Sequence, residues 1–326
     1  MTHRRAVHWL GLGVALLSVA VVCSDMIWTT SVKYDTGRKP TVSVRGKTVV
    51  EVHMSDNNPS LWYTVGRLDP EAGDVTWSKA VKYDSGITPS IALGPNGIAI
   101  EVHESEGSNS LWYHVGLVDA ERGTIQWSPS VKYDSGRRPC VAIDQDGNIL
   151  EVHISDVQAQ LWYHLGRLDA SGKSVVWEKS VKYDNGILPT VAFARPCVVV
   201  EAHQSETTST LWYHVGRLDA SGKTLTWGTS VKFDNGITST IGAGEGDDVI
   251  EVHRSETGDS LWYHTGTLAA DSNSIAWGKS VKYDNGVFPA IGVGTKVAVV
   301  EVHKSEATNT LWYHVGKFAE SPVKRD

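Results

Sequence analysis

Several residue patterns are missing from this chain of 326 residues, and each absence excludes a class of protein. There are 3 cysteines, and Cys140 and Cys197 have no metal-ligand spacing, so the sequence predicts neither a disulfide framework nor a cysteine metal site. No long Lys/Arg run occurs and the net charge is -7, which argues against a nucleic-acid partner. A Gly-x-Ser-x-Gly nucleophile motif and a dense Asp-x-Asp calcium series are also missing.

The sequence does contain a repeat of fifty residues. Glu-Val-His begins at 51, 101, 151, 251 and 301, and Glu-Ala-His begins at 201. Leu-Trp-Tyr begins at 61, 111, 161, 211, 261 and 311, and a further Trp lies at 28, 77, 127, 177, 227 and 277. Self-similarity at this period is the signature of solenoids and propellers. The sequence therefore predicts one domain built from six copies of a single unit.

Each copy reads as four short strands separated by turns. In the second copy, apolar and β-branched residues run from Pro89, Ile98, Leu111 and Thr124, with Gly, Asn and Asp between the runs. Four antiparallel strands per unit, apolar on both faces in the middle, are typical of a propeller blade. We predict an all-β, six-bladed β-propeller. Because the segment at 28–35 matches a fourth strand and the last copy ends after its third, the N-terminal strand is expected to complete the last blade.

Residues 1–24 stand outside the repeat. Arg4 and Arg5 precede an apolar stretch from Trp9 to Cys23, which predicts a secretory signal peptide. A retained membrane anchor and lipidation of Cys23 are the alternatives. We expect two regions, a signal peptide or N-terminal anchor at 1–24 and the propeller at 25–326, and a secreted or cell-surface location.

One layout recurs in every copy and carries a family resemblance. In the second copy it is Leu111-Trp112-Tyr113-His114, then Trp127, then the Val131-Lys132-Tyr133-Asp134 turn. This layout is similar to that of lectin propellers of the tachylectin-like and Photorhabdus-lectin-like kind. The resemblance implies carbohydrate binding in clefts between blades, with glycans or glycoconjugates as partners, and it names no particular sugar.

The repeated polar residues are the candidate site. Strand alternation places each Glu and His of Glu-x-His on one face of a strand. These residues form either a hydrogen-bonded structural bracket or, together with the Trp of Leu-Trp-Tyr, sugar pockets in which a carboxylate binds hydroxyls and the ring stacks on a pyranose. Position 64 holds Thr where the other copies have His. The candidate ligand-binding residues are Glu51, Glu101, Glu151, Glu201, Glu251, Glu301, His53, His103, His153, His203, His253, His303, Trp62, Trp112, Trp162, Trp212, Trp262 and Trp312.

Repetition also shapes the expected function. Chemistry performed once needs one site that differs from its neighbours, so we expect a multivalent carbohydrate-binding protein that is not an enzyme and has no catalytic residues. We expect neither a cofactor nor a bound metal, because each Glu-x-His pair would have to recruit further donors from elsewhere. A protein-interaction scaffold that uses the variable loops is the alternative, and a propeller hydrolase with a metal in the central channel is a third hypothesis.

Overall fold

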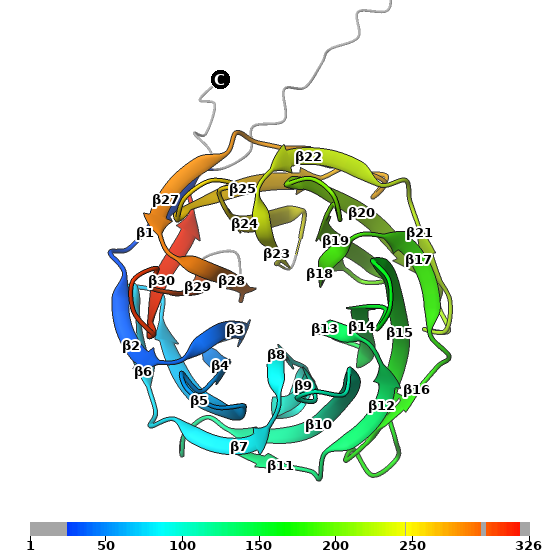
Figure 1. Cartoon of the computed structure of the whole chain (residues 1–326), viewed down its shortest axis with the longest axis horizontal. Helices are drawn as coiled ribbons and strands as arrows, with labels where there is room; N and C mark the ends of the chain where they lie inside the picture. Colours follow the sequence, from blue (N-terminus) through cyan, green and yellow to red (C-terminus); the bar gives the residue numbers. More distant parts are fainter. Residues whose placement is uncertain (1–24, 245, 295–297, 320–326) are drawn as a thin grey trace, which may run out of the picture.

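The computed structural model describes residues 25–244, 246–294 and 298–319, so the predicted signal peptide or anchor at 1–24 lies outside the described residues. The described chain forms six sheets arranged in a ring around a central opening (Figure 1). This confirms the prediction of an all-β six-bladed propeller. Within the described residues, none of the helical structure has the length and apolar character needed to cross a membrane.

The blades follow one another along the chain. The first contains β3 (Arg38–Arg45), β4 (Thr48–Met54), β5 (Ser60–Asp69), β6 (Asp74–Trp77) and β7 (Val81–Ser85). The second contains β8 (Ile87–Leu93), a short 3-10 turn η1 (Pro95–Gly97), β9 (Ile98–Glu104), β10 (Ser110–Asp119), β11 (Thr124–Trp127) and β12 (Val131–Ser135). The third contains β13 (Arg137–Ile143), β14 (Asn148–Ile154), β15 (Gln160–Leu168), β16 (Val175–Trp177) and β17 (Val181–Asn185).

The second half of the ring repeats this pattern. The fourth blade contains β18 (Ile187–Arg195), β19 (Val198–Gln204), β20 (Thr210–Leu218), β21 (Leu225–Trp227) and β22 (Val231–Asn235). The fifth contains β23 (Ile237–Ala243), β24 (Asp248–Arg254), β25 (Ser260–Leu268), β26 (Ile275–Trp277) and β27 (Val281–Asn285). The sixth contains β28 (Val287–Val293), β29 (Val299–Lys304) and β30 (Thr310–Phe318), completed by β1 (Met26–Trp28) and β2 (Val32–Thr36).

The fourth, outermost strand of each blade is interrupted. In the second blade, β11 pairs with one half of β10 and β12 pairs with the other half, both antiparallel. The interruption, at Ser128 to Ser130, lets the outer strand bend around the blade. The predicted four strands per blade are therefore present, with the fourth divided into two segments.

The N-terminal strands close the ring, as the sequence predicted. Met26 pairs with Phe318 and Trp28 with Gly316, while Val32 pairs with Tyr313 further along β30. In Figure 1 the blue N-terminal strand β2 accordingly lies beside the red β30. The pairing removes a free sheet edge that would otherwise be open to association with another chain.

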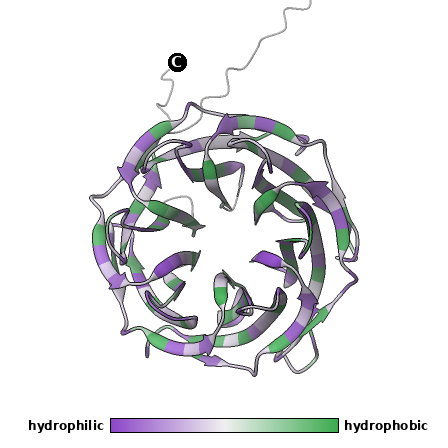
Figure 2. Ribbon diagram, viewed as in Figure 1, coloured by the Kyte–Doolittle hydropathy of each residue, from purple (hydrophilic) through white to green (hydrophobic). Residues whose placement is uncertain are grey.

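The core lies between blades rather than inside one blade. Six clusters of buried apolar residues fill the six contacts between neighbouring blades, and the cluster that joins the last blade to the first contains Val42, Val49, Val300 and Val315. Strand β4 is buried on both faces because blades cover it on both sides. Along the outermost strands, by contrast, hydrophilic and hydrophobic positions alternate (Figure 2). We call each contact between two blades a junction, and we call the contact between the last and first blades the first junction.

Candidate functional site at the blade junctions

The predicted residues meet on one face of each blade. In the second blade, the register of β9 and β10 places Glu101 opposite His114 and His103 opposite Trp112. The four side chains therefore share the face that packs against the preceding blade. Asp84, at the end of β7 in that preceding blade, completes the group, and it lies 2.8 Å from Nε2 of His114.

The Glu of Glu-x-His is completely buried in each junction. Glu101 is completely buried, and its carboxylate accepts a hydrogen bond from Nδ1 of His103 at 3.0 Å and from the Tyr83 hydroxyl at 2.9 Å. The other five Glu residues of the motif are also completely buried, and each is bound by the His two positions later. Where the Tyr hydroxyl of the preceding blade also donates, as it does to Glu101, Glu201 and Glu301, the carboxylate joins two blades. Whether any of these Glu residues also binds a ligand stays a prediction.

One junction has a different second donor to the buried carboxylate. Phe233, in the fourth blade, stands where the other copies have Tyr, so the hydroxyl that reaches the Glu is missing there. In the fifth blade, Ser239 stands where the other copies have Pro, and its hydroxyl donates to Oε1 of Glu251 at 2.6 Å. A residue of the next blade thus supplies the hydrogen bond that Phe233 cannot make.

The second His, present in five of the six copies, joins two hydrogen-bond acceptors. Nδ1 of His114 lies 2.8 Å from the backbone carbonyl of Ser128, and Nε2 lies 2.8 Å from Asp84. Burial alone would lower the pKa of His114, but the hydrogen bond to Asp84, the charge of Glu101 and the Ser128 carbonyl together outweigh burial, and the pKa is raised. Burial would likewise raise the pKa of Asp84, yet the hydrogen bonds from His114 and Ser85 lower it to about 2. A positive charge shared between the two groups is therefore favourable.

Five junctions have this arrangement. Nε2 of the second His lies 2.7 to 2.8 Å from an Asp of the preceding blade, in the pairs His114–Asp84, His164–Asp134, His214–Asp184, His264–Asp234 and His314–Asp284. We call these the closed junctions, because an imidazole spans the gap between two blades in each.

The first junction differs. Thr64 replaces the His, and its hydroxyl donates to the Ser78 carbonyl at 2.9 Å, which is the bond that Nδ1 makes elsewhere. Thr64 does not reach the neighbouring carboxylate. Among the described residues, the only hydrogen-bond donor to Asp35 is the backbone N–H of Thr36, at 2.7 Å.

A cavity of about 480 Å³ opens at the first junction. Its walls include the predicted residues His53 and Trp62, together with Asp35, Asp56 and Lys79. Glu51 lies behind His53 and accepts hydrogen bonds from Nδ1 of that ring at 3.0 and 3.2 Å. The structure thus places the predicted His and Trp of the first copy in the cavity wall and leaves the predicted Glu51 completely buried, outside the wall.

The two repeated tryptophans have different surroundings. The Trp of Leu-Trp-Tyr is half-buried at each junction, whereas the other Trp stacks on the Tyr of the preceding blade's turn, as Trp127 does on Tyr83 with ring centroids 5.2 Å apart. Tyr83 and Asp84 belong to the segment of the first copy that is equivalent to the Val131-Lys132-Tyr133-Asp134 turn. Their repetition in Val-Lys-Tyr-Asp-x-Gly was the signal available, but the sequence did not show which blade they contact.

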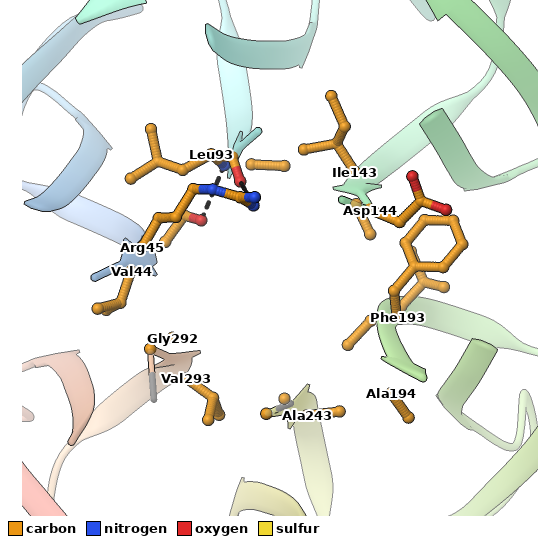
Figure 3. Close-up of a pocket in the computed structure, with 18 of the residues that line it drawn as sticks. Val44, Arg45, Leu93, Ile143, Asp144, Phe193, Ala194, Ala243, Gly292 and Val293 are labelled. Carbon is orange, nitrogen blue, oxygen red and sulfur yellow. Dashed lines mark hydrogen bonds between the residues drawn. The ribbon is translucent and has the colours of Figure 1, made fainter. Parts of the chain in front are cut away.

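The central channel is a separate, mainly apolar cavity of about 710 Å³ (Figure 3). Val44, Leu93, Ile143 and Phe193 project into it from inner strands, and Arg45 binds the Leu93 carbonyl at 3.4 Å near one mouth. Among the described residues, the groups of three His, Asp or Glu side chains close enough to hold a metal lie at the closed junctions. The channel therefore lacks such a group within the described part of the chain.

Structural comparison shows what this ring resembles. It is similar to an α-L-arabinanase of Penicillium chrysogenum, solved with arabinobiose, with a TM-score of 0.57 and 12% identity over 89% of this chain and 98% of that chain. It is also similar to a point mutant of the NanB sialidase of Streptococcus pneumoniae, with a TM-score of 0.59 and 9% identity over 91% of this chain and 70% of that chain. Neither a protein-family model nor a curated protein matches the sequence. At these identities the likeness shows the fold alone, and it confirms the propeller without singling out lectins.

The expectation that this chain is not an enzyme is wrong as an inference from repetition, because the two neighbours with this fold are an arabinanase and a sialidase. That inference rests on the premise that a repeated chain has no site that differs from its neighbours. A closed ring of similar blades nevertheless contains features that occur once, including the central channel and a junction that differs from the rest.

Proposed function

We propose that this chain is an exported carbohydrate-binding propeller and that the first junction is its principal sugar pocket. The observation that carries the proposal is the 480 Å³ cavity where Thr64 replaces the spanning imidazole. That volume is within the range of small-molecule sites, which is about 300–1,000 Å³. The fold similarity to an arabinanase and a sialidase gives independent support for a carbohydrate ligand.

The cavity wall offers the groups that a pyranose requires. A sugar ring has an apolar C–H face, for which the half-buried indole of Trp62 provides a platform, and an edge of hydroxyl groups. Asp35 and Asp56 accept hydrogen bonds from hydroxyls, and the exposed Lys79 donates them. His53 is 2% exposed and fixed by Glu51, so its orientation is set before a ligand arrives.

In the multivalent form of this proposal, the closed junctions also bind sugar, as the repeated pockets predicted from the sequence would. Each closed junction keeps a half-buried Trp and a partly exposed Asp at its outer edge, as Trp112 and Asp84 do in the second. Several weak sites on one rigid ring can raise avidity by about 10²–10⁴ when the ligand presents matching copies. The number of sugars bound per chain distinguishes one open pocket from six equal ones.

The test is a glycan array with the purified chain, followed by calorimetry on the sugars that bind and an assay of released reducing ends, which detects turnover. We expect saturable binding to a defined sugar class, with one tight site per chain. Binding should persist in EDTA, because the described pocket residues bind hydroxyls directly. A blank array on folded protein would reject the proposal, and sugar-independent capture of a protein would support the scaffold alternative.

Two variants locate the site. Thr64→His places in the first junction the side chain that spans the other five, so it should fill the cavity and abolish tight binding without unfolding the ring. Thr64→Ser keeps the hydroxyl and the open space, and it should bind as the unsubstituted chain does. Equal binding by both variants would show that the sugar binds elsewhere.

A further inference from the structure

The closed junctions contain a cluster whose hydrogen bonding is incomplete without a cation. In the second junction, Nδ1 of His114 lies 2.8 Å from a backbone carbonyl and Nε2 lies 2.8 Å from the Asp84 carboxylate. Both partners are acceptors only, whereas a neutral imidazole has a single N–H. With Nδ1–H directed at the carbonyl, Nε2 of a neutral ring turns a lone pair toward a carboxylate, so either a second proton on the ring or a metal ion has to lie between them.

A second imidazole converges on the same oxygen. Nε2 of His103 lies 3.8 Å from Oδ2 of Asp84, and its Nδ1 lies 3.0 Å from the Glu101 carboxylate. The two rings are nearly parallel, with centroids 5.8 Å apart. Two imidazole nitrogens and one carboxylate oxygen are therefore gathered in one place, and the donor atoms all lie within 4.8 Å of one another.

We propose that each closed junction binds one divalent transition-metal ion, with zinc as the representative ion, through the Asp carboxylate of one blade and the two His Nε2 atoms of the next. Zinc takes His at about 2.0–2.1 Å and Asp at about 2.0–2.2 Å in tetrahedral sites, so its donors lie roughly 3.3–3.5 Å apart. The two Asp84–His distances lie on either side of that value. A shift of the carboxylate by roughly 0.5 Å would make them equal.

The surroundings of the cluster match those of metal-ligating imidazoles. Such a His usually donates its other N–H to a carboxylate or a backbone carbonyl, which fixes the tautomer, and Glu101 and Ser128 provide these two acceptors. A divalent ion also balances the two carboxylates of the junction, whose burial without a counter-charge would be costly. The Asp84 side chain is 28% exposed while both imidazoles are almost completely buried, so a fourth coordination position and the path for entry lie on the Asp side.

The same geometry occurs at the other closed junctions. The more distant Nε2–Asp separation is 3.7 to 3.9 Å at each of them, for His153, His203, His253 and His303. At the third junction the three donors within 4.8 Å of one another are Glu151, His153 and His164, and Oδ2 of Asp134 lies 2.7 and 3.9 Å from the two Nε2 atoms. The first junction lacks the third donor because Thr64 replaces the His, so the chain contains its own negative control.

The experiment counts ions per chain. Untagged full-length protein is stripped with EDTA, incubated with excess Zn²⁺, freed of unbound metal by gel filtration and measured by elemental analysis against protein concentration. We expect five zinc ions per chain, one for each closed junction. Cobalt substitution should give the visible absorption of a tetrahedral Co²⁺ site at the same stoichiometry.

Single substitutions test the assignment. His114→Gln should lower the count by one, and Thr64→His should raise it by one by completing a cluster with Asp35 and His53. Thr64→Val, which adds no donor, should leave the count unchanged. Less than one zinc per folded chain, or a count unaffected by Thr64→His, would overturn the proposal. If Thr64→His instead raised the melting temperature equally with and without EDTA and bound no zinc, a proton rather than a metal would bridge the cluster. Sugar binding in EDTA is measured separately, so failure of the metal proposal leaves the carbohydrate proposal standing.

Discussion

The substitution Ser239→Ala removes one hydrogen bond to a buried Glu of the repeated Glu-x-His motif, the bond from the Ser239 hydroxyl to Glu251. The Ser239 hydroxyl is buried and donates to the completely buried Glu251 at 2.6 Å, and Phe233 offers no substitute. Hydrogen bonds to charged groups contribute about 1.5–3 kcal/mol, and leaving a buried acceptor unsatisfied incurs its desolvation penalty. We therefore expect Ser239→Ala to lower the free energy of unfolding by about 1.5–3 kcal/mol.

Phe233→Tyr should restore that loss in the Ser239→Ala background. The Phe233 ring stacks on Trp277 with centroids 5.0 Å apart, as the Tyr83 ring stacks on Trp127 at 5.2 Å. A hydroxyl added to Phe233 would therefore be directed at Glu251, since the Tyr83 hydroxyl reaches the equivalent Glu at 2.9 Å. The double variant rebuilds the hydrogen bond that other copies use.

The assay is a double-mutant cycle measured by urea unfolding. Four proteins are compared: the unsubstituted chain, the two single variants and the double variant. The slope of the free energy of unfolding against urea concentration should be the same for all four, so that differences in midpoint report differences in stability. We expect a coupling energy of about 1–3 kcal/mol between the two positions. A cost below about 0.5 kcal/mol for Ser239→Ala, or no recovery on adding the tyrosine, would refute the compensation argument.

Three further predictions concern the ring as a whole. Burial and the neighbouring Glu raise the pKa of Tyr83 and its equivalents Tyr34, Tyr133, Tyr183 and Tyr283 well above the usual value of about 10. Their contribution to stability is present below pH 10 and lost as pH rises above it, so the tyrosinate absorbance of these five residues should appear only together with alkaline unfolding, and titration of all 11 tyrosines at pH 10 in folded protein would contradict this. Gly116→Ala would bring a Cβ within 2.6 Å of Ile125 and 2.7 Å of the Trp127 ring, so we expect a loss of about 1–3 kcal/mol in urea unfolding, and an unchanged midpoint would refute the packing argument. Deleting residues 1–36 should expose the edge of β30 and produce association in light scattering, whereas a monomeric variant with unchanged melting temperature would show that β1 and β2 do not hold the ring closed.

The fold was readable from the sequence because the repeat and the strand pattern agree at every copy. A fifty-residue period fixed the number of blades, and the phase of the first and last copies predicted that β2 would pair with β30. The shared face of Glu101, His103 and Trp112 followed from strand alternation alone. These inferences depend only on the spacing of residues along the chain, because the alternation of side chains along a β-strand is the same in every protein.

The junction chemistry was not readable in the same way. Asp84 lies 30 residues before His114 and belongs to another blade, so no local spacing shows that the two side chains meet. The sequence therefore does not indicate which further side chains lie close to each Glu-x-His pair. The substitution at Thr64 was visible, but the resulting cavity depends on how two blades pack against each other.

The two departures from the repeat have opposite consequences, and the difference between them points to function. Where Phe233 removes a hydroxyl from the buried bracket, Ser239 supplies another, so the carboxylate of Glu251 keeps its donor. Where Thr64 removes the imidazole from the first junction, its hydroxyl restores only the bond to the Ser78 carbonyl. Nothing among the described residues takes the place of the imidazole at Asp35, and a cavity remains. A lost structural contact is thus replaced in the bracket, whereas the gap at the first junction is left open. A ligand site requires an open space of this kind, between a carboxylate and a fixed imidazole. In the five closed junctions a single His at the position of Thr64 occupies the equivalent space.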